Sequence, residues 1–441
     1  MSFIPMRAKR TALAAAAAGL LLSTAACGSS DNTSDNADNG DGGTSSGPVT
    51  MTLWTNSTTG AGLDFFTNAA AAYHTANPNV TIKVQSVQNE DYDGKLQTAL
   101  QAGQGSAPDI MYQRGGGKML AMVQAGQLGE VNVSSDVQSN ISAGAMSIYQ
   151  ADGKTYGIPL SITPEGIWYS KDLFKKAGVE IPTTIDQLAD AAKKLKAAGT
   201  PLAVGGKDGW PAAHWYYMFA VRDCSQDALN KAATSAKFDD DCFLQAGKDL
   251  GAFVATNPFE SDAFNVAAQG SAASTAGLLA NHKVAGELMG AWEPGVVGDL
   301  TPNKKPLADL GYFPFPATAN GGGDPAAMMQ GADGYSCSAW APKECSDFLN
   351  FIASPDQETK YAAAFSTIPA NKAAQGSVTD SATKSALEAS NNAPYSVLFL
   401  DTLFGSTVGG ALNTAVVNFM SGQTSDPQSI VDAVNNASDK G

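Results

Sequence analysis

The side chains best suited to ligand chemistry are aromatic and acidic residues in two short stretches. Trp292 and Glu293 follow the apolar run 284–289. Trp210 and His214 belong to an eleven-residue stretch in which six side chains are aromatic, counting His. An indole offers a flat apolar face, and a carboxylate accepts hydrogen bonds. Two alternatives stay open, because Trp is often a core residue and a lone His beside aromatic rings is often a hydrogen-bonded core histidine.

Polar residues follow three predicted strands near the N-terminus. The expected elements alternate as strands 49–54, 80–85 and 107–112 and helices 63–75, 92–103 and 118–125. This strand–helix alternation predicts a parallel sheet, in which ligands bind beyond the carboxyl ends of the strands. Asn56, Glu90 and Gln113 lie at those ends and are candidate ligand contacts. For any one of them, a solvated loop is the simpler interpretation.

Further along the chain, a buried strand over 284–289 should stop at Gly290 and carry Trp292 at its end. Neighbours on a strand point to opposite faces, so Glu293 reaches the same ligand only if the chain bends. Glu165 precedes a short predicted strand, 167–169, and Asp333 falls in a later extended stretch. Both complete the candidate set.

The composition indicates a globular protein of two domains. The chain has 441 residues, with 27 Lys and Arg against 42 Asp and Glu, giving a net charge of −15. An acidic chain of this kind argues against nucleic acid or an anionic membrane surface as the main partner.

The first residues are typical of an exported lipoprotein. Basic residues precede the apolar run 11–22, which is too short for a comfortable transmembrane helix. Small residues then precede Cys27, although Thr24 stands where Leu is commoner in a lipidation motif. We therefore predict a signal peptide over 1–26, a lipidated Cys27 and a disordered tether over 27–48. Secretion without a lipid anchor is the alternative.

Four other cysteines lie within the folded body. Cys224 and Cys242 are 18 residues apart, and Cys337 and Cys345 are 8 apart. In an exported chain these predict disulfides, of which the two local pairs are favoured among three connectivities. A zinc site would need closer Cys spacing or a neighbouring His.

Other chemistries find little support. Gly115 to Lys118 lacks the spacing of a phosphate-binding loop, and no nucleophile-elbow motif is present. The histidines are scattered, so neither a metal nor a cofactor is expected. Glu165 and Glu293 could form the carboxylate pair of a glycan-processing enzyme, which is the main enzymatic alternative.

The chain resembles the extracellular solute-binding proteins of bacterial carbohydrate ABC importers, the family of maltose-binding protein. The resemblance spans the body from about residue 49 onward and depends on six ordered motifs: Asn-Pro-Asn-Val-Thr-Ile-Lys-Val at 77–84, Ala-Pro-Asp-Ile at 107–110, Tyr-Gly-Ile-Pro at 156–159, Trp-Tyr-Ser-Lys-Asp-Leu-Phe at 168–174, Gly-Ala-Trp at 290–292 and Ser-Pro-Asp-Gln-Glu at 354–358. The stretches 207–224 and 331–338 are similar to actinobacterial oligosaccharide-binding lipoproteins, of which xylobiose-type binders are the nearest.

The resemblance implies a two-lobed α/β fold with a hinge and an inter-lobe ligand cleft. The lobes would be 49–162 plus 332–372 and 163–331 plus 373–441. It also implies an oligosaccharide ligand, delivery to the transmembrane subunits of an ABC permease, no enzymatic activity, a monomeric state and a membrane contact through the lipid anchor only. A solute receptor of the same fold for a non-sugar ligand is the remaining alternative.

The family supplies expected roles for individual residues. Asn56, Glu90, Gln113 and Glu165 occupy positions that reach the ligand, and Trp292 falls where an aromatic ring stacks on the sugar. The maltose binder has a second stacking Trp in its C-terminal helices, where this chain has Ser-Thr-Val-Gly-Gly-Ala at 406–411. A second wall built by Trp210 or Trp215 is expected instead, with His214 beside Trp210. Glu293 and Asp333 join the polar residues that are expected to bind sugar hydroxyls.

Overall fold

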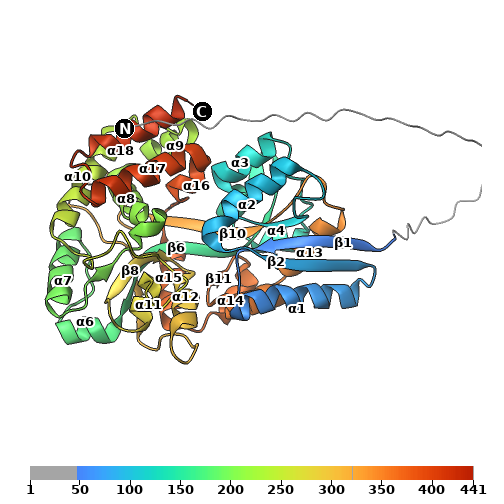
Figure 1. Cartoon of the computed structure of the whole chain (residues 1–441), viewed down its shortest axis with the longest axis horizontal. Helices are drawn as coiled ribbons and strands as arrows, with labels where there is room; N and C mark the ends of the chain where they lie inside the picture. The colour runs from blue at the N-terminus through green and yellow to red at the C-terminus, as the bar shows by residue number, and fades with distance from the viewer. Residues whose placement is uncertain (1–46, 320, 441) are drawn as a thin grey trace, which may run out of the picture. The chain divides into compact units, whose positions relative to one another are not determined.

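The computed structural model describes residues 47–319 and 321–440 (Figure 1). The predicted signal peptide, Cys27 and all but the end of the tether lie outside these residues. Within the described part of the chain, no helix has the length and apolar character needed to span a membrane.

The first elements alternate between strand and helix, as predicted. They are β1 (Val49–Thr55), α1 (Gly60–Ala76), β2 (Val80–Ser86), α2 (Asn89–Ala102), β3 (Ile110–Gln113) and α3 (Gly116–Gln124). β1 pairs in parallel with β2 on one side and with β3 on the other. The carboxyl ends of all three strands therefore meet at one edge of the sheet, where the candidate polar residues were expected.

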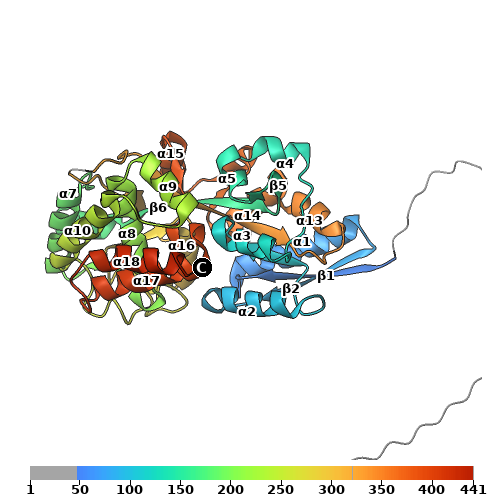
Figure 2. The ribbon, with the colours of Figure 1, turned by 90° about the horizontal axis from the view of Figure 1, so that it is seen from above.

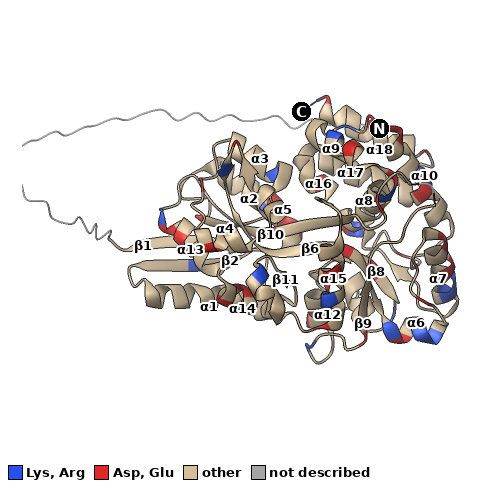
Figure 3. Cartoon of the chain, turned by 180° about the vertical axis from the view of Figure 1, so that it is seen from behind, with Lys and Arg blue, Asp and Glu red and all other residues tan. Residues whose placement is uncertain are grey.

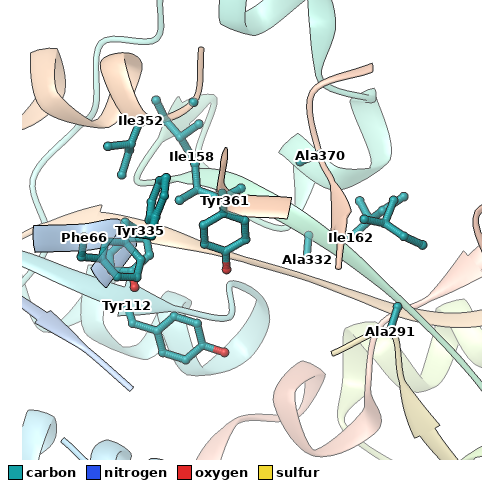
Figure 4. Packing of buried hydrophobic residues seen from close by; sticks show 14 of the residues in the cluster. Phe66, Tyr112, Ile158, Ile162, Ala291, Ala332, Tyr335, Ile352, Tyr361 and Ala370 are labelled. Carbon is teal, nitrogen blue, oxygen red and sulfur yellow. The ribbon is translucent and has the colours of Figure 1, made fainter. Parts of the chain in front are cut away.

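Helix α1 shows how this part of the sheet is covered. Its buried side chains recur at helical spacing and include Phe66 and Tyr73. The Phe66 ring lies 5.0 Å from Tyr335 and 6.3 Å from Tyr361, so α1 packs on residues that come much later in the chain (Figure 4). The helix ends before Pro78, which cannot continue it.

Two long strands run through the middle of the sheet. β6 (Ile158–Ser170) and β10 (Met328–Cys337) are antiparallel partners, and the strand order is β2-β1-β3-β10-β6-β8-β7. β6 is far longer than the predicted strand 167–169. Pro159 is accommodated because the register shifts between Asp333 and Gly334 opposite it, and proline is tolerated at such irregularities.

The second half of β6 has different partners from the first. Glu165–Tyr169 pairs with β8 (Gly286–Gly290), and Ile167–Ser170 pairs with β9 (Leu310–Phe313). The surrounding elements are α6 (Lys171–Ala177), α7 (Ile185–Ala197), β7 (Leu202–Ala203), α8 (Trp210–Asp223), α9 (Gln226–Ser235), α10 (Asp241–Ala255), α11 (Thr275–Ala280) and α12 (Glu293–Leu300).

The remaining elements are two short strands that join this sheet, a separate pair of strands and further helices. They are α4 (Ser135–Asn140), α5 (Ala143–Ser147), β4 (Gln150–Ala151), β5 (Lys154–Thr155), η1 (Gly206–Asp208), α13 (Glu344–Ile352), α14 (Pro355–Phe365), β11 (Ile368–Pro369), η2 (Lys372–Ser377), α15 (Ser381–Asn392), β12 (Ser396–Val397), α16 (Leu400–Leu403), α17 (Gly405–Met420) and α18 (Gln428–Ser438). The strands that join the sheet are β11 and β12, and the separate pair is β4 and β5. The C-terminal helices α16 and α17 lie beside α3, as both views show (Figures 1 and 2).

Charged and apolar residues are sorted between surface and core. Acidic and basic residues are mixed on outer helices such as α6 and α7 (Figure 3). The central strands β6 and β10 each carry a single charged residue, Glu165 and Asp333 respectively. A charge on a buried strand is costly unless it has a specific partner or a function.

Disulfides join Cys224 to Cys242 and Cys337 to Cys345, the two local pairs. The first links the end of α8 to the start of α10, with 5.1 Å between the Cα atoms. The second links β10 to α13, with 6.0 Å between the Cα atoms.

Candidate functional site

Four rings from three separate segments form an aromatic cluster, defined as Trp210, His214, Trp292 and Phe399. Trp210 and His214 lie one turn apart on α8, with ring centroids 5.0 Å apart. Trp292 meets Trp210 edge-on at 6.0 Å and Phe399 edge-on at 5.8 Å, and Phe399 stacks on His214 at 4.9 Å. Trp210 and Trp292 are only partly buried. Part of each indole is therefore accessible to a ligand.

The strand stops at Gly290, as predicted, but Trp292 does not lie on it, so only the placement of Trp292 on the strand is wrong. β8 ends at Gly290, Trp292 is the N-cap residue of α12 and Glu293 is the first residue of that helix. Pro294 favours a helix start because its fixed backbone angle suits the first turn. Gly290 allows the indole to fold back on the chain, since a Cβ atom there would collide with the six-membered ring of Trp292.

His214, a member of the aromatic cluster, forms a buried pair with Glu165. Glu165 is 0% exposed and His214 is 3% exposed. Glu165 Oε1 lies 3.0 Å from His214 Nδ1, and the Tyr312 hydroxyl donates to the Glu165 carbonyl oxygen at 3.0 Å. This arrangement holds the imidazole ring against Phe399, as a hydrogen-bonded core histidine would be held. A ligand on the accessible indoles would contact these two side chains only after a rearrangement.

A second buried acid pair, Glu287 on β8 and Glu293 on α12, lies in the same region. Each is 1% exposed. Burial raises the pKa of Glu287 to about 7. Burial, with the negative charges of Glu287 and Glu165, raises the pKa of Glu293 well above its ordinary value. Both carboxylate oxygens of Glu287 and one of Glu293 lack a hydrogen-bond partner among the described residues, so the pair is costly to ionise.

Polar residues at the carboxyl ends of β1, β2 and β3 form a strand-end network, defined as Asn56, Asn89, Asp93, Arg114 and Lys118. Asn56 Nδ2 donates to Asn89 Oδ1 at 3.2 Å, and Arg114 Nη2 donates to the same oxygen at 2.7 Å. Arg114 and Lys118 also bind the two oxygens of Asp93, at 2.8 and 3.0 Å. Although burial opposes it, these two cations lower the pKa of Asp93 to about 2.

Glu90 lies at the exposed edge of this network. Gln88 Nε2 donates to it at 2.9 Å, and Gln269 Nε2, distant in sequence, donates at 3.2 Å. Partial burial would raise the pKa of Glu90, but hydrogen bonds from Gln88, Gln269 and the backbone outweigh it and lower that pKa. Glu90 is therefore an ionised hydrogen-bond acceptor that links the start of α2 to Gln269, far along the chain.

Gln113 and Asp333 lie on adjacent strands at the same edge. Gln113 is almost fully buried, and its Oε1 accepts from the Arg114 backbone N–H at 2.9 Å. The register pairs Gln113 with Gly334, which places Asp333 on the neighbouring position. Burial raises the pKa of Asp333, and the charge of Arg114 partly offsets the effect.

A cavity of about 390 Å³ opens beside the strand-end network. We call it the Arg114 cavity; its polar lining includes Asp93, Gln97, Gln113, Arg114, Asp401 and Asn413. Its walls come from α2 and α3 on one side and from α16 and α17 on the other. Asn413 Nδ2 donates to Asp401 Oδ2 at 3.2 Å and so orients that carboxylate. Phe399 and Asp401, two residues apart, thus serve the aromatic cluster and the cavity respectively.

The structure gathers the predicted residues into two groups. The first group belongs to the aromatic cluster or adjoins it and consists of Glu165, Trp210, His214, Trp292 and Glu293. The second group belongs to the strand-end network or adjoins it and consists of Asn56, Glu90, Gln113 and Asp333. In the part of the chain that the structure describes, no three His, Cys, Asp or Glu side chains are placed to hold a metal ion.

Several contributors were missed or misplaced. Trp215 cannot form a second wall, because it is fully buried and stacks on Phe253 at 5.2 Å in the core of the second part of the sheet. Phe399, Arg114 and Asp401 were not in the predicted set. Arg114 could have been found from its place in the loop after β3, whereas Phe399 and Asp401 come from a C-terminal segment without a distinguishing pattern.

A mixed sheet that changes partners along β6 and β10, flanked by helices, is the architecture of two-lobed periplasmic binding proteins. The structure is similar to one from a study of xylan utilization by Caldanaerobius polysaccharolyticus, with a TM-score of 0.78, 23% identity and coverage of 89% of this chain and 99% of that chain. It is also similar to a Streptomyces glaucescens GacH receptor structure, with a TM-score of 0.71, 22% identity and coverage of 89% and 97%. These likenesses establish the fold.

The sequence comparisons establish the family. Residues 56–359 match the family described as bacterial extracellular solute-binding protein, so the chain belongs to that family. It is 24% identical over 328 residues to the melibiose/raffinose/stachyose-binding protein MelE of Bacillus subtilis, covering 72% of this chain and 73% of MelE. It is also 24% identical over 218 residues to the multiple sugar-binding protein of Streptococcus mutans, covering 48% and 50%. Both relatives are named as sugar-binding proteins.

Proposed function

We propose that this chain captures a neutral oligosaccharide and delivers it to the transmembrane subunits of a bacterial ABC importer. The observation that carries the proposal is the combination of two partly exposed indoles in the aromatic cluster with carboxylate, amide and guanidinium groups in the strand-end network. A pyranose has apolar C–H faces, which aromatic rings cover. It also has a rim of hydroxyl groups, which must be hydrogen-bonded when they are buried.

The candidate residues divide into contacts and supports. We infer that Trp210 and Trp292 stack on sugar rings, and that hydroxyl groups are bound by Asn56, Glu90, Gln113 and Asp333. Glu165, His214 and Glu293 are buried, and His214 is itself one of the cluster rings. Their proposed role is to position the indoles, with ligand contact only if the site rearranges on binding.

We further propose lobes at 49–162 plus 332–372 and 163–331 plus 373–441, closing by a hinge. Support comes from β6, whose partners change from β10 to β8 and β9 close to Pro164. A strand shared by two groups of partners is a natural place for two lobes to meet. Closing them around a sugar would exclude water and strengthen its hydrogen bonds.

The finer ligand class is a short plant-derived chain such as xylobiose or a related xylo-oligosaccharide. One structural neighbour was determined in a study of xylan utilization, and another is a chitin oligosaccharide binding protein. The relative MelE is named for melibiose, raffinose and stachyose. Together these favour short oligosaccharides as a class.

We also propose that the mature chain is exported, is anchored through a lipid on Cys27, keeps both local disulfides and works as a monomer. Mass spectrometry of the membrane fraction tests the anchor, because a lipidated Cys27 adds a defined mass to the N-terminal peptide. Non-reducing digestion tests the disulfides, since both local pairs predict cross-linked peptides.

The deciding experiment is isothermal titration calorimetry against xylo-, chito-, malto- and galacto-oligosaccharides, with peptides and polyamines as non-sugar ligands. Binding to a sugar series alone is expected. Binding to peptides or polyamines alone would favour the non-sugar receptor. Prolonged incubation with the protein should leave the bound sugar intact. Hydrolysis of the sugar would instead favour a glycan-processing enzyme with Glu165 and Glu293 as its carboxylate pair.

A further inference from the structure

A second hollow, on the other side of α2, shares only Glu90 with the proposed ligand contacts. We call it the Trp54 groove; it is lined by residues that include Trp54, Glu90, Asp91, Lys95, Thr98 and Ser106, and its volume is about 670 Å³. Trp54 is partly buried, and its Nε1 donates to Gln85 Oε1 at 2.8 Å. The indole is thus fixed across β1 and β2, with an aromatic surface on the groove.

The groove adjoins the proposed site at two points. Glu90 lines the groove and also accepts from Gln269 beside the strand-end network. Gly94 lines both the Trp54 groove and the Arg114 cavity. Helix α2 therefore separates the two hollows, and at Gly94 no side chain stands between them.

Gly94 itself has no explanation in the packing of the chain. It lies in the interior of α2 with ordinary helical geometry, where glycine weakens a helix relative to alanine. It is exposed, and a Cβ atom built there would meet nothing within 4 Å. No side chain of the fold occupies the space beside Gly94, so the surface between the two hollows is open at this point.

We propose that the binding site is open-ended: an oligosaccharide bound at the strand-end network enters the Arg114 cavity beside Gln113, and a chain too long for this cavity crosses α2 at Gly94 and places its outer pyranose units against Trp54. The inference rests on the proposed function and adds the length of chain that the protein accepts. The groove has the composition that such units need, an indole for the ring face and Asp91, Lys95 and Thr98 for hydroxyl groups. Between Glu90 and Ala102, α2 extends about 18 Å, which is enough for several sugar units.

The test is calorimetry with two homologous series, xylobiose to xylohexaose and the corresponding chito-oligosaccharides, on four proteins. These are the wild type, Trp54→Ala, Gly94→Leu and the matched control Gly144→Leu. Gly144, in α5, is also exposed, and a Cβ atom at that position would have no atom within 4 Å, but Gly144 lines neither hollow. A melting curve for each protein checks that it is folded.

The wild type should bind longer chains more tightly than the disaccharide. Trp54→Ala should weaken binding of the longest chains about tenfold and of the disaccharide less than about twofold, as expected when one stacking ring is lost. Gly94→Leu should also remove the gain with length, whereas Gly144→Leu should retain it. A gain that survives both groove variants, or no gain with length in the wild type, overturns the inference alone. Failure of the wild type to bind any member of either series counts against the proposed function as well.

Discussion

Replacing Glu287 by Gln should stabilise the protein, and increasingly so as the pH rises. Glu287 and Glu293 lie together in the interior, each 1% exposed. Burial raises the pKa of Glu287 from 4.5 to about 7 in the folded protein. The folded state therefore binds a proton more tightly than the unfolded state between these two values. The free energy of unfolding falls as the pH rises through that window.

The size of the effect follows from the same two values. A pKa raised from 4.5 to about 7 corresponds to roughly 3 kcal/mol of lost stability once the pH exceeds the folded value. The carboxamide of the Glu287→Gln variant would carry no charge and would also relieve the negative potential on Glu293. The variant should match the wild type near pH 4 and exceed its unfolding free energy by up to about 3 kcal/mol near pH 8.

Urea unfolding followed by tryptophan fluorescence, at several values between about pH 4 and pH 8, measures this difference. Glu260 and Asp223 also have pKa values raised to about 7 by burial, but their contributions cancel when the two proteins are compared. Glu180→Gln, at an exposed position, is the control and should give a difference that does not change with pH. A Glu287→Gln variant that loses stability near pH 8, or whose advantage is the same at every pH, would refute the reasoning.

Three further predictions concern the site directly. Trp292→Ala should cost at least about 2 kcal/mol of sugar-binding energy in calorimetry, the scale of a lost aromatic hot spot; unchanged affinity would make Trp292 a structural residue only. Gly290→Ala should displace the Trp292 indole and lower the unfolding free energy by about 1–3 kcal/mol, so a melting temperature equal to the wild type would contradict the packing described. Asp93→Asn should lower stability by less than about 1 kcal/mol near pH 7, because the ion pairs with Arg114 and Lys118 are partly exposed. This loss should fade as the pH falls through the low pKa of Asp93, about 2, and stability curves that stay parallel down to that pH would count against it.

The N-terminal half of the fold could be predicted from sequence because its signals are local. The strands β1 and β2 are short apolar or alternating runs, each closed by a polar loop and followed by a helical repeat. Parallel strands place their carboxyl ends at one edge, so Asn56, Glu90 and Gln113 could be expected together from the sequence alone. Arg114 and Asp93 were harder, since their pairing joins the end of β3 to the middle of α2.

Strand β6 shows why local signals fail elsewhere. It contains two prolines, which end or demote a strand when they are judged from neighbouring residues alone. Pro159 is accepted because β10 shifts its register opposite it, and β10 is distant from Pro159 in sequence. The error at Trp292 has the same origin, because the turn after Gly290 depends on the indole packing over that glycine.

The largest gap between sequence and site concerns burial. Glu165 and Glu293 are residue types that bind sugar hydroxyls, and their positions in the chain suggested that role, yet the folded chain covers both of them. Whether a ligand can contact Glu165 or Glu293 depends on how the rings of the aromatic cluster pack. One of those rings, Phe399, comes from a segment far beyond Trp292 in the chain. Residue type and spacing identify which side chains have suitable chemistry. Only the packing of distant segments determines which of those side chains a ligand can reach.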